Sequence, residues 1–145
     1  MPVLEQVLKN YPEKVKIVFK HFPIQDHKFA MKAASAAQAA ESYGKFWQFH
    51  DLLFKNYDKL NDLKIQDISL MLGLDQAEFK KSMTEPGIQA KVNQDLMDGI
   101  RAGVQGTPAV FINGKIIRNL SFGGLQAAID AELQKLAKKP DRPGS

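Results

Sequence analysis

The 145-residue sequence contains no cysteine. The thiolate is the reactive form of cysteine in nucleophilic catalysis, and it is also the form that binds metals. The absence of thiols therefore excludes an internal disulfide, a thiolate metal centre and a cysteine nucleophile within these residues.

Long apolar runs are also missing, and charge is only mildly unbalanced. No run of 18 apolar residues occurs, so no membrane span is expected, and no basic-then-apolar leader is recognised at the start. The formal net charge is +4 and the sequence pI is about 9.2. Because lysines and arginines are scattered, with no basic stripe interleaved with aromatics, we expect no nucleic-acid partner.

The sequence has no pattern typical of a metal or phosphate site. Its histidines, His21, His27 and His50, are not spaced like standard zinc ligands, so we expect no metal and no cofactor. Gly123-Gly124 is not followed by the Gly-Lys-Ser/Thr of a phosphate loop, and we interpret it as a hinge into the last helix.

Two acidic residues share one predicted helix. Asp95 and Asp98 lie three positions apart, which places them on one helix face. Nothing in the sequence supplies a partner acid, base or metal. We therefore expect both carboxylates to be solvated.

Most of the chain has helical periodicity. Asp26 and Asp75 are candidate N-caps, and Gly44, Gly73 and Gly103 are candidate helix ends. We interpret residues 60–65 as a connector. The predicted helices are 2–10, 26–43, 45–56, 66–72, 75–83, 86–102 and 125–137.

Residues 14–20 alternate apolar and polar side chains and are predicted to form a strand. Val15, Ile17 and Phe19 would face one side and the lysines the other. Val18 interrupts the polar side, which indicates burial on both faces. His21-Phe22-Pro23 would close the strand.

A second extended region begins at Gly106-Thr107-Pro108. A residue before proline is driven toward extended backbone, so a turn is followed by a strand over residues 109–112. Asn113-Gly114 is the strongest short hairpin signal, because both central positions of a type I′ turn need positive φ. Ile116-Ile117 would return as the partner strand.

The segment Gly-Thr-Pro-Ala-Val-Phe-Ile-Asn-Gly, residues 106–114, resembles the cis-proline loop and hairpin of the DsbA-like branch of the thioredoxin-like superfamily. Residues 16–23 and 44–50 are similar to that family's second strand and first inserted helices. The resemblance implies an α/β fold, α+β by content: one domain over residues 1–137 with a helical insertion at about 26–103. Residues 138–145 are expected to form a disordered tail.

The resemblance also implies the site. Gly106, Thr107 and Pro108 would bind substrate: the Thr107–Pro108 bond would be cis, and Thr107 would offer backbone groups to a bound peptide. His21 follows the predicted strand and is a candidate neighbour of the active centre. We expect His50 to be packed and Lys20 to extend its charge into solvent.

The aromatic residues Phe46, Trp47 and Phe49 could line a peptide groove. A helical stripe of aromatics is more often core, however, and we predict a core position for these three.

Members of this family begin with a strand and a Cys-x-x-Cys at the start of the first helix, and this chain starts inside that helix. No catalytic residue is therefore assigned, the chain as given is expected to be inactive, and the natural protein is expected to carry the cysteines upstream. The missing strand would be central, between residues 15–19 and 109–112. We predict that a strand from another copy fills the gap or that the flanking strands pair directly.

The leading functional interpretation is a DsbA-like thiol–disulfide oxidoreductase that, in its complete form, acts on cysteine-containing polypeptides or unfolded proteins. The family implies a periplasmic or extracytoplasmic location. One alternative is a non-redox peptide-binding or scaffold module that uses the cis-proline loop. Another is a protein similar to the kappa-class glutathione transferases, whose serine would occupy the same missing position.

Overall fold

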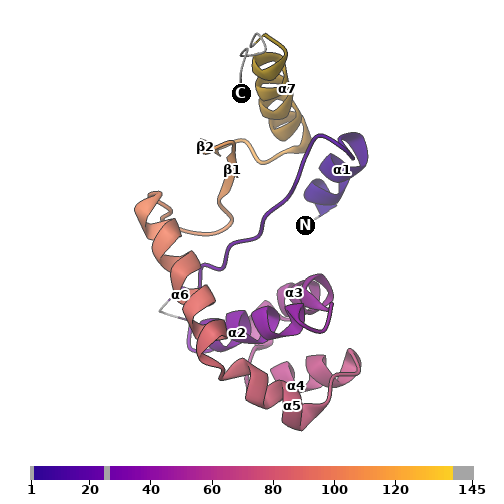
Figure 1. Ribbon diagram of the computed structural model, residues 1–145, viewed down its shortest axis with the longest axis vertical. Coiled ribbons are helices and arrows are strands. Elements are labelled where there is room, and N and C mark those ends of the chain that lie inside the picture. The colour runs from indigo at the N-terminus through magenta and orange to yellow at the C-terminus, as the bar shows by residue number, and fades with distance from the viewer. Residues whose placement is uncertain (1, 25–26, 139–145) are drawn as a thin grey trace, which may run out of the picture. The chain divides into compact units, whose positions relative to one another are not determined.

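The computed structural model describes residues 2–24 and 27–138 (Figure 1). The chain divides into two compact units. One contains residues 19–105, and the described part of the other contains residues 2–18 and 106–138. The assignment of all of these residues to one domain with an inserted helical segment remains a prediction.

The unit of residues 19–105 is helical. Its helices, with a short 3₁₀ turn after the second, are α2 (Ala30–Glu41), α3 (Phe46–Lys55), η1 (Tyr57–Lys59), α4 (Asp62–Met71), α5 (Gln76–Met83) and α6 (Pro86–Arg101).

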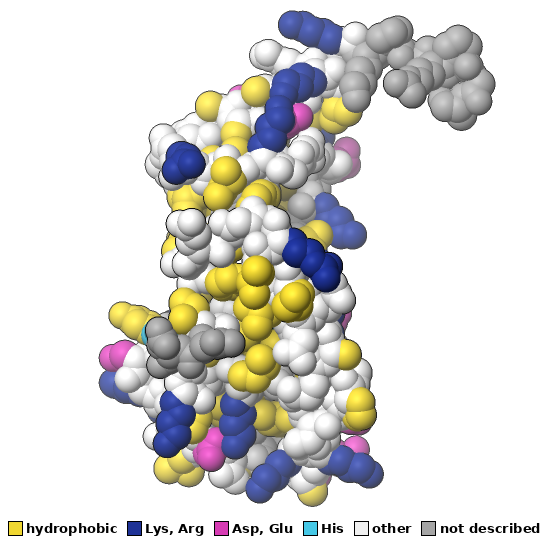
Figure 2. Space-filling model, turned by 90° about the vertical axis from the view of Figure 1, so that its left-hand side faces the viewer, with side chains coloured by type: hydrophobic (Ala, Val, Ile, Leu, Met, Phe, Trp, Pro, Cys, Tyr) yellow, Lys and Arg dark blue, Asp and Glu magenta, His cyan; other side chains and the backbone are white. Residues whose placement is uncertain are grey.

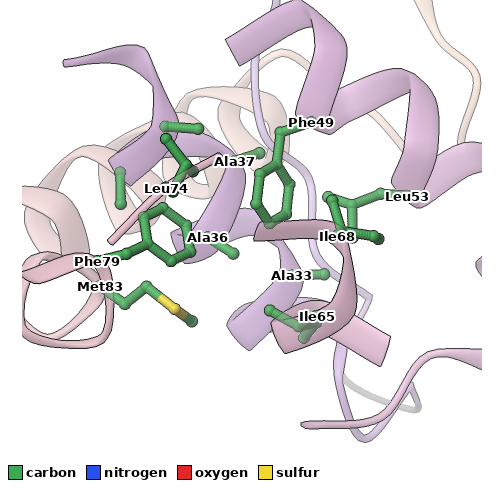
Figure 3. Close-up of a cluster of buried hydrophobic side chains, with 12 residues drawn as sticks. Ala33, Ala36, Ala37, Phe49, Leu53, Ile65, Ile68, Leu74, Phe79 and Met83 are labelled. Carbon is green, nitrogen blue, oxygen red and sulfur yellow. The ribbon is translucent and has the colours of Figure 1, made fainter. Parts of the chain in front are cut away.

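Helix α2 lies at the centre of this unit because alanine covers most of its surface. Its buried residues Ala36, Ala39 and Ala40 are fully enclosed, and small side chains let neighbouring helices approach the α2 backbone closely. Phe49 from α3 and Phe79 from α5 pack in the same cluster, with ring centroids 5.5 Å apart (Figure 3). The predicted core position of Phe49 is confirmed.

The ends of these helices follow local sequence signals. Asp75 caps α5 by accepting a hydrogen bond from the Glu78 main-chain N–H at 2.9 Å. Gly44, Gly73 and Gly103 have φ values of +69°, +72° and +82°, which only glycine adopts without strain. The predicted cap and the three predicted helix ends are confirmed.

Two helix starts differ from the prediction. Residues 60–65 were expected to connect helices, but α4 already begins at Asp62, because the Asn61 side chain accepts from the Lys64 N–H at 2.7 Å and caps it. The helix expected from residue 26 begins at Ala30. The proposed cap, Asp26, lies outside the described residues.

The described part of the other unit contains two helices and one hairpin: α1 (Pro2–Asn10), β1 (Val110–Ile112), β2 (Lys115–Ile117) and α7 (Phe122–Lys138). The strands are antiparallel, with Ile112 opposite Lys115. Asn113 and Gly114 have φ values of +48° and +82°, which confirms the predicted type I′ turn.

Helices α1 and α7 enclose the core of this unit. Val7, Leu125 and Ile129 are buried between them, and the Tyr11 hydroxyl donates to Asp130 Oδ1 at 2.6 Å. The Asp130 hydrogen bond raises the pKa of the Tyr11 phenol.

The last helix starts earlier than predicted. It begins at Phe122 instead of Leu125, because the Ser121 hydroxyl accepts from the Gly124 N–H at 3.1 Å, so Gly123-Gly124 lies within the first turn. Lys138, which the prediction assigned to the tail, is the last residue of α7. Residues 139–145 lie outside the described residues.

The strand predicted over residues 14–20 is not formed. Residues 15–24 have no assigned helix or strand, although Val15 and Ile17 are half-buried while Lys16 and Val18 are exposed. Val18 is 64% exposed, so the predicted burial on both faces is wrong. A strand needs a hydrogen-bonded neighbour, and in the described chain β1 pairs only with β2. Direct pairing of the flanking segments is therefore also wrong.

Candidate functional site

The loop before β1 is open to solvent. Gly106, Thr107, Pro108 and Ala109 are all exposed, and the Thr107–Pro108 peptide bond is cis, as the resemblance implied. Among the described residues, no hydrogen bond involves the main-chain N–H or C=O of Thr107. The described part of the chain therefore makes no use of the Thr107 main-chain groups.

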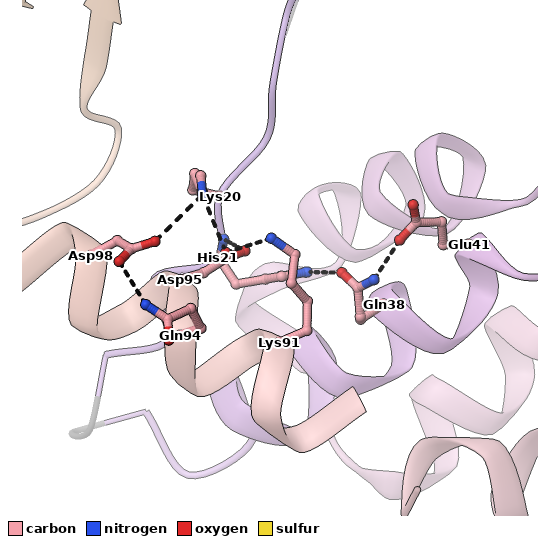
Figure 4. A network of polar contacts seen from close by, with 8 residues as sticks. All are labelled: Lys20, His21, Gln38, Glu41, Lys91, Gln94, Asp95 and Asp98. Carbon is pink, nitrogen blue, oxygen red and sulfur yellow. Dashed lines mark hydrogen bonds and ion pairs between the residues drawn. The ribbon is translucent and has the colours of Figure 1, made fainter. Parts of the chain in front are cut away.

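His21, near the end of the segment 15–24, is buried in a polar network that also includes residues of helix α6 (Figure 4). Its main-chain N–H donates to Asp95 Oδ2 at 3.0 Å. Its ring Nε2 lies 2.9 Å from Gln38 Oε1 on α2, and Gln38 in turn donates to Glu41. The network therefore joins three parts of the helical unit through one histidine.

Asp95 is the negative centre of this network. Its side chain is fully buried, and Oδ1 lies 2.7 Å from Lys91 Nζ and 3.7 Å from Lys20 Nζ. The expectation that Asp95 is solvated is wrong, because the α6 backbone directs its carboxylate toward the His21 N–H and two lysines. The Lys91–Asp95 spacing of four residues is a helical ion-pair signal that the sequence already contained.

Asp98 lies at the edge of the same network. Its side chain is 38% exposed, with Oδ2 3.5 Å from Lys20 Nζ and Oδ1 accepting from Gln94 at 2.8 Å. The Gln94 hydrogen bond, together with Lys20, lowers the pKa of Asp98. Lys20 thus pairs with two carboxylates instead of only extending into solvent.

The surroundings of His21 favour its neutral imidazole. Burial is the largest effect and lowers the pKa of His21, while the hydrogen bond with Gln38 and the charge of Asp95 oppose that shift. His21 is therefore suited to a hydrogen-bonding role and not to carrying a permanent positive charge.

Aromatic rings surround the second buried histidine, His50. Phe19 lies 4.7 Å from His50 and 5.1 Å from His21 between ring centroids, so one phenylalanine contacts both imidazoles. Phe46 and Trp47 of α3 continue the cluster, 5.1 Å apart. The packed position predicted for His50 is confirmed.

Sequence reasoning misplaced one member of this cluster. Trp47 was expected in the core, but its side chain is 47% exposed. The exposed position arises because α3 turns Phe49 and Leu53 toward α2 and leaves Trp47 on the solvent side.

The described histidine and acidic side chains are not grouped as metal ligands. Within residues 2–24 and 27–138, no three histidine or acidic side chains form a group that could hold a metal ion. His27 is exposed, whereas His21 and His50 are buried.

A family model described as Thioredoxin matches residues 2–131. The Na⁺/H⁺ antiporter NhaA 3 of Salinispora tropica is 33% identical over 115 residues, which cover 79% of this chain and 18% of the antiporter. A probable disulfide bond formation protein D of Bacillus cereus is 31% identical over 144 residues and covers 92% of this chain.

The fold is also found in a crystal structure. The thiol-disulfide exchange protein α-DsbA2 of Wolbachia pipientis matches with a TM-score of 0.78 and 24% identity, over 90% of this chain and 72% of that one. The chain spans less than a fifth of the antiporter and 66% of the Bacillus protein. No helix in the described part of the chain is long and apolar enough to cross a lipid bilayer.

Replacement of Asp95 by alanine is expected to destabilise the protein strongly. The change leaves the buried His21 N–H and the Lys91 ammonium without their acceptor, at a cost of about 3 kcal/mol in the free energy of unfolding. Urea denaturation measures it. The matched control is Asp98→Ala at the exposed edge of the network, with an expected loss below about 1 kcal/mol. Equal losses of unfolding free energy in the two variants would contradict the assignment of Asp95 as the centre of the network.

Acidification is expected to weaken the helical unit through His21. Because the folded-state pKa of His21 lies below the unfolded value of about 6.5, the unfolded chain binds more protons between those two values. As far as His21 is concerned, the free energy of unfolding therefore has its full value above about pH 6.5 and falls as the pH drops through this window. Urea midpoints between pH 7.5 and 5 measure the slope, which His21→Gln should reduce. The control is His27→Gln; an unchanged slope in His21→Gln would refute the assignment.

Proposed function

Because this chain belongs to the thioredoxin family, in its DsbA-like branch, we propose that it provides the polypeptide-binding surface of a thiol–disulfide oxidoreductase. In its complete form the protein would act on cysteine-containing polypeptides outside the cytoplasm. The 145 residues contain no thiol. The chain by itself is therefore proposed to bind polypeptides without exchanging their disulfides.

The observation that carries the proposal is the exposed loop at Thr107. Its main-chain groups have no partner in the described chain, and the loop leads directly into β1, whose edge away from β2 is also unpaired there. An extended peptide can add to such an edge by main-chain hydrogen bonds, which are independent of its sequence. Binding of many different unfolded polypeptides needs this kind of recognition.

Surface composition is compatible with such a partner. Hydrophobic side chains reach the surface on the face shown in Figure 2, and lysine and arginine side chains are dispersed over it. Phe111 of β1 is 37% exposed and Ile116 of β2 is 50% exposed. The hairpin therefore presents apolar side chains beside its main-chain groups, and both contribute to binding an extended chain.

The absence of cysteine favours one second candidate, a non-redox peptide-binding or scaffold module. Such a module needs the Thr107-Pro108 surface and no thiol. The two candidates predict the same binding by this chain, and they differ in whether the complete protein exchanges disulfides. An insulin-reduction assay on the chain alone is expected to read zero, and measurable turnover would contradict both candidates.

Replacement of Pro108 by alanine is expected to weaken the binding of a cysteine-free unfolded polypeptide by at least about fivefold. Proline fixes its own φ and keeps Thr107 extended, so the substitution lets the loop leave the conformation that presents the Thr107 backbone. Fluorescence anisotropy of a labelled polypeptide measures the dissociation constant. Pro12→Ala, at an exposed proline of the same unit, is the control. Equal affinity of both variants would refute the proposed site.

A second copy of the chain is proposed to occupy the gap beside residues 16–18. These residues form no main-chain hydrogen bond with the described chain, and Val15 beside them packs in the core that also contains β1 residues Val110 and Ile112. Unpaired edges recruit strands. Size-exclusion chromatography with light scattering should show a concentration-dependent dimer that Val18→Pro abolishes, because proline removes a main-chain donor. A monomer at all concentrations would contradict this assembly.

A further inference from the structure

Helix α3 presents a mixed aromatic and acidic surface to solvent. Trp47, Asp51 and Phe54 lie at positions i, i+4 and i+7, the spacing of one helix face. Their exposed fractions are 47%, 59% and 58% respectively. We refer to these three residues as the α3 surface.

The three side chains meet at the ring of His50. The His50 ring centroid lies 5.4 Å from that of Trp47 and 4.5 Å from that of Phe54, and His50 Nδ1 lies 3.1 Å from Asp51 Oδ1. His50 itself is buried. The buried imidazole thus holds two exposed rings and one exposed carboxylate around a single point.

The charge of the Asp51 carboxylate is not neutralised by a lysine or arginine of the described chain. In the described part of the chain, no lysine or arginine forms an ion pair with it, and its polar contact there is with the neighbouring His50 ring. Lys20, Lys32, Lys91, Lys115 and Lys135, in contrast, all pair with acidic residues elsewhere. The negative charge of Asp51 is therefore available to a ligand.

Aromatic rings add to this negative potential. The face of an aromatic ring carries partial negative charge, and tryptophan attracts cations most strongly. A carboxylate between two exposed rings combines an ion pair with cation–π contact at one place. The chain has a net charge of +4, so the attraction for a cation is local to this surface and does not come from the molecule as a whole.

We propose that the α3 surface binds an arginine side chain of the polypeptide partner. The guanidinium pairs with Asp51 and stacks on Trp47 or Phe54. Arginine suits the surface better than lysine, because its planar group both stacks on rings and donates two parallel hydrogen bonds to a carboxylate. This inference rests on the proposed function and narrows it, since it favours unfolded segments that contain arginine.

The test uses the fluorescence of Trp47, which is the only tryptophan in the sequence. A short cysteine-free peptide containing arginine is titrated into the full chain, beside the same peptide with citrulline, which keeps the shape and lacks the charge. The arginine peptide is expected to change the Trp47 emission and to bind about fivefold or more tightly than the citrulline peptide, and added salt should reduce the difference. Equal binding of the two peptides, or no change in emission, would overturn the proposal.

Asp51→Asn removes the charge and keeps the size of the side chain. It should reduce the preference for arginine over citrulline to near unity, whereas Asp67→Asn, the same change on the neighbouring α4, should leave it unaltered. Circular dichroism checks that both variants fold. An arginine preference that persists in Asp51→Asn would overturn the inference.

The two proposals can fail separately. If Pro108→Ala weakens polypeptide binding while Asp51→Asn leaves the arginine preference intact, the α3 site is refuted and the proposed function stands. If the arginine preference depends on Asp51 but Pro108→Ala has no effect on polypeptide binding, the α3 site stands and the loop site is refuted.

Discussion

A polypeptide backbone can form a strand only where another strand accepts its hydrogen bonds, and residues 15–24 lack that neighbour in the described chain. Side chains hold the segment instead. Val15 packs in the core of α1 and α7, and in the other unit Phe19 packs among the aromatic rings of α3. The His21 N–H finds its acceptor in Asp95. The lack of a partner strand also leaves the main-chain groups of residues 16–18 without hydrogen-bond partners in the described chain.

The buried carboxylate of Asp95 has a different role from the exposed carboxylate of Asp51. Asp95 satisfies a main-chain donor and is compensated by Lys91 and Lys20, so its charge is used within the protein. Asp51 forms its polar contact in the described chain with the His50 ring, and its side chain stays 59% exposed. Asp95 is buried and its charge is balanced by lysines, so it has a structural role. Asp51 is exposed and its charge is available to a ligand, although both residues lie on amphipathic helices of one unit.

Prediction from sequence succeeded where the physical signal is local. Asp75 and the three helix-ending glycines act within one turn, and Asn113-Gly114 specifies its hairpin by backbone preference alone. It failed where the outcome depended on distant residues. The alternation of residues 14–20 predicted a strand, but alternation describes only which side chains are buried and does not provide a hydrogen-bonding neighbour. The exposed position of Trp47 and the burial of Asp95 likewise depend on how α3 and α6 pack.

The amino-acid sequence by itself determined the absence of a thiol among these 145 residues, the order of most helices, the hairpin and the family resemblance, because composition and short-range preferences decide each of these. Only the tertiary structure decided that Asp95 is buried beside His21, that Asp51 lies between two exposed rings, and that residues 15–24 find no partner strand in the described chain. These features join residues far apart in the chain or depend on helix packing, and the energies of burial and pairing that control them exist only once the helices have packed.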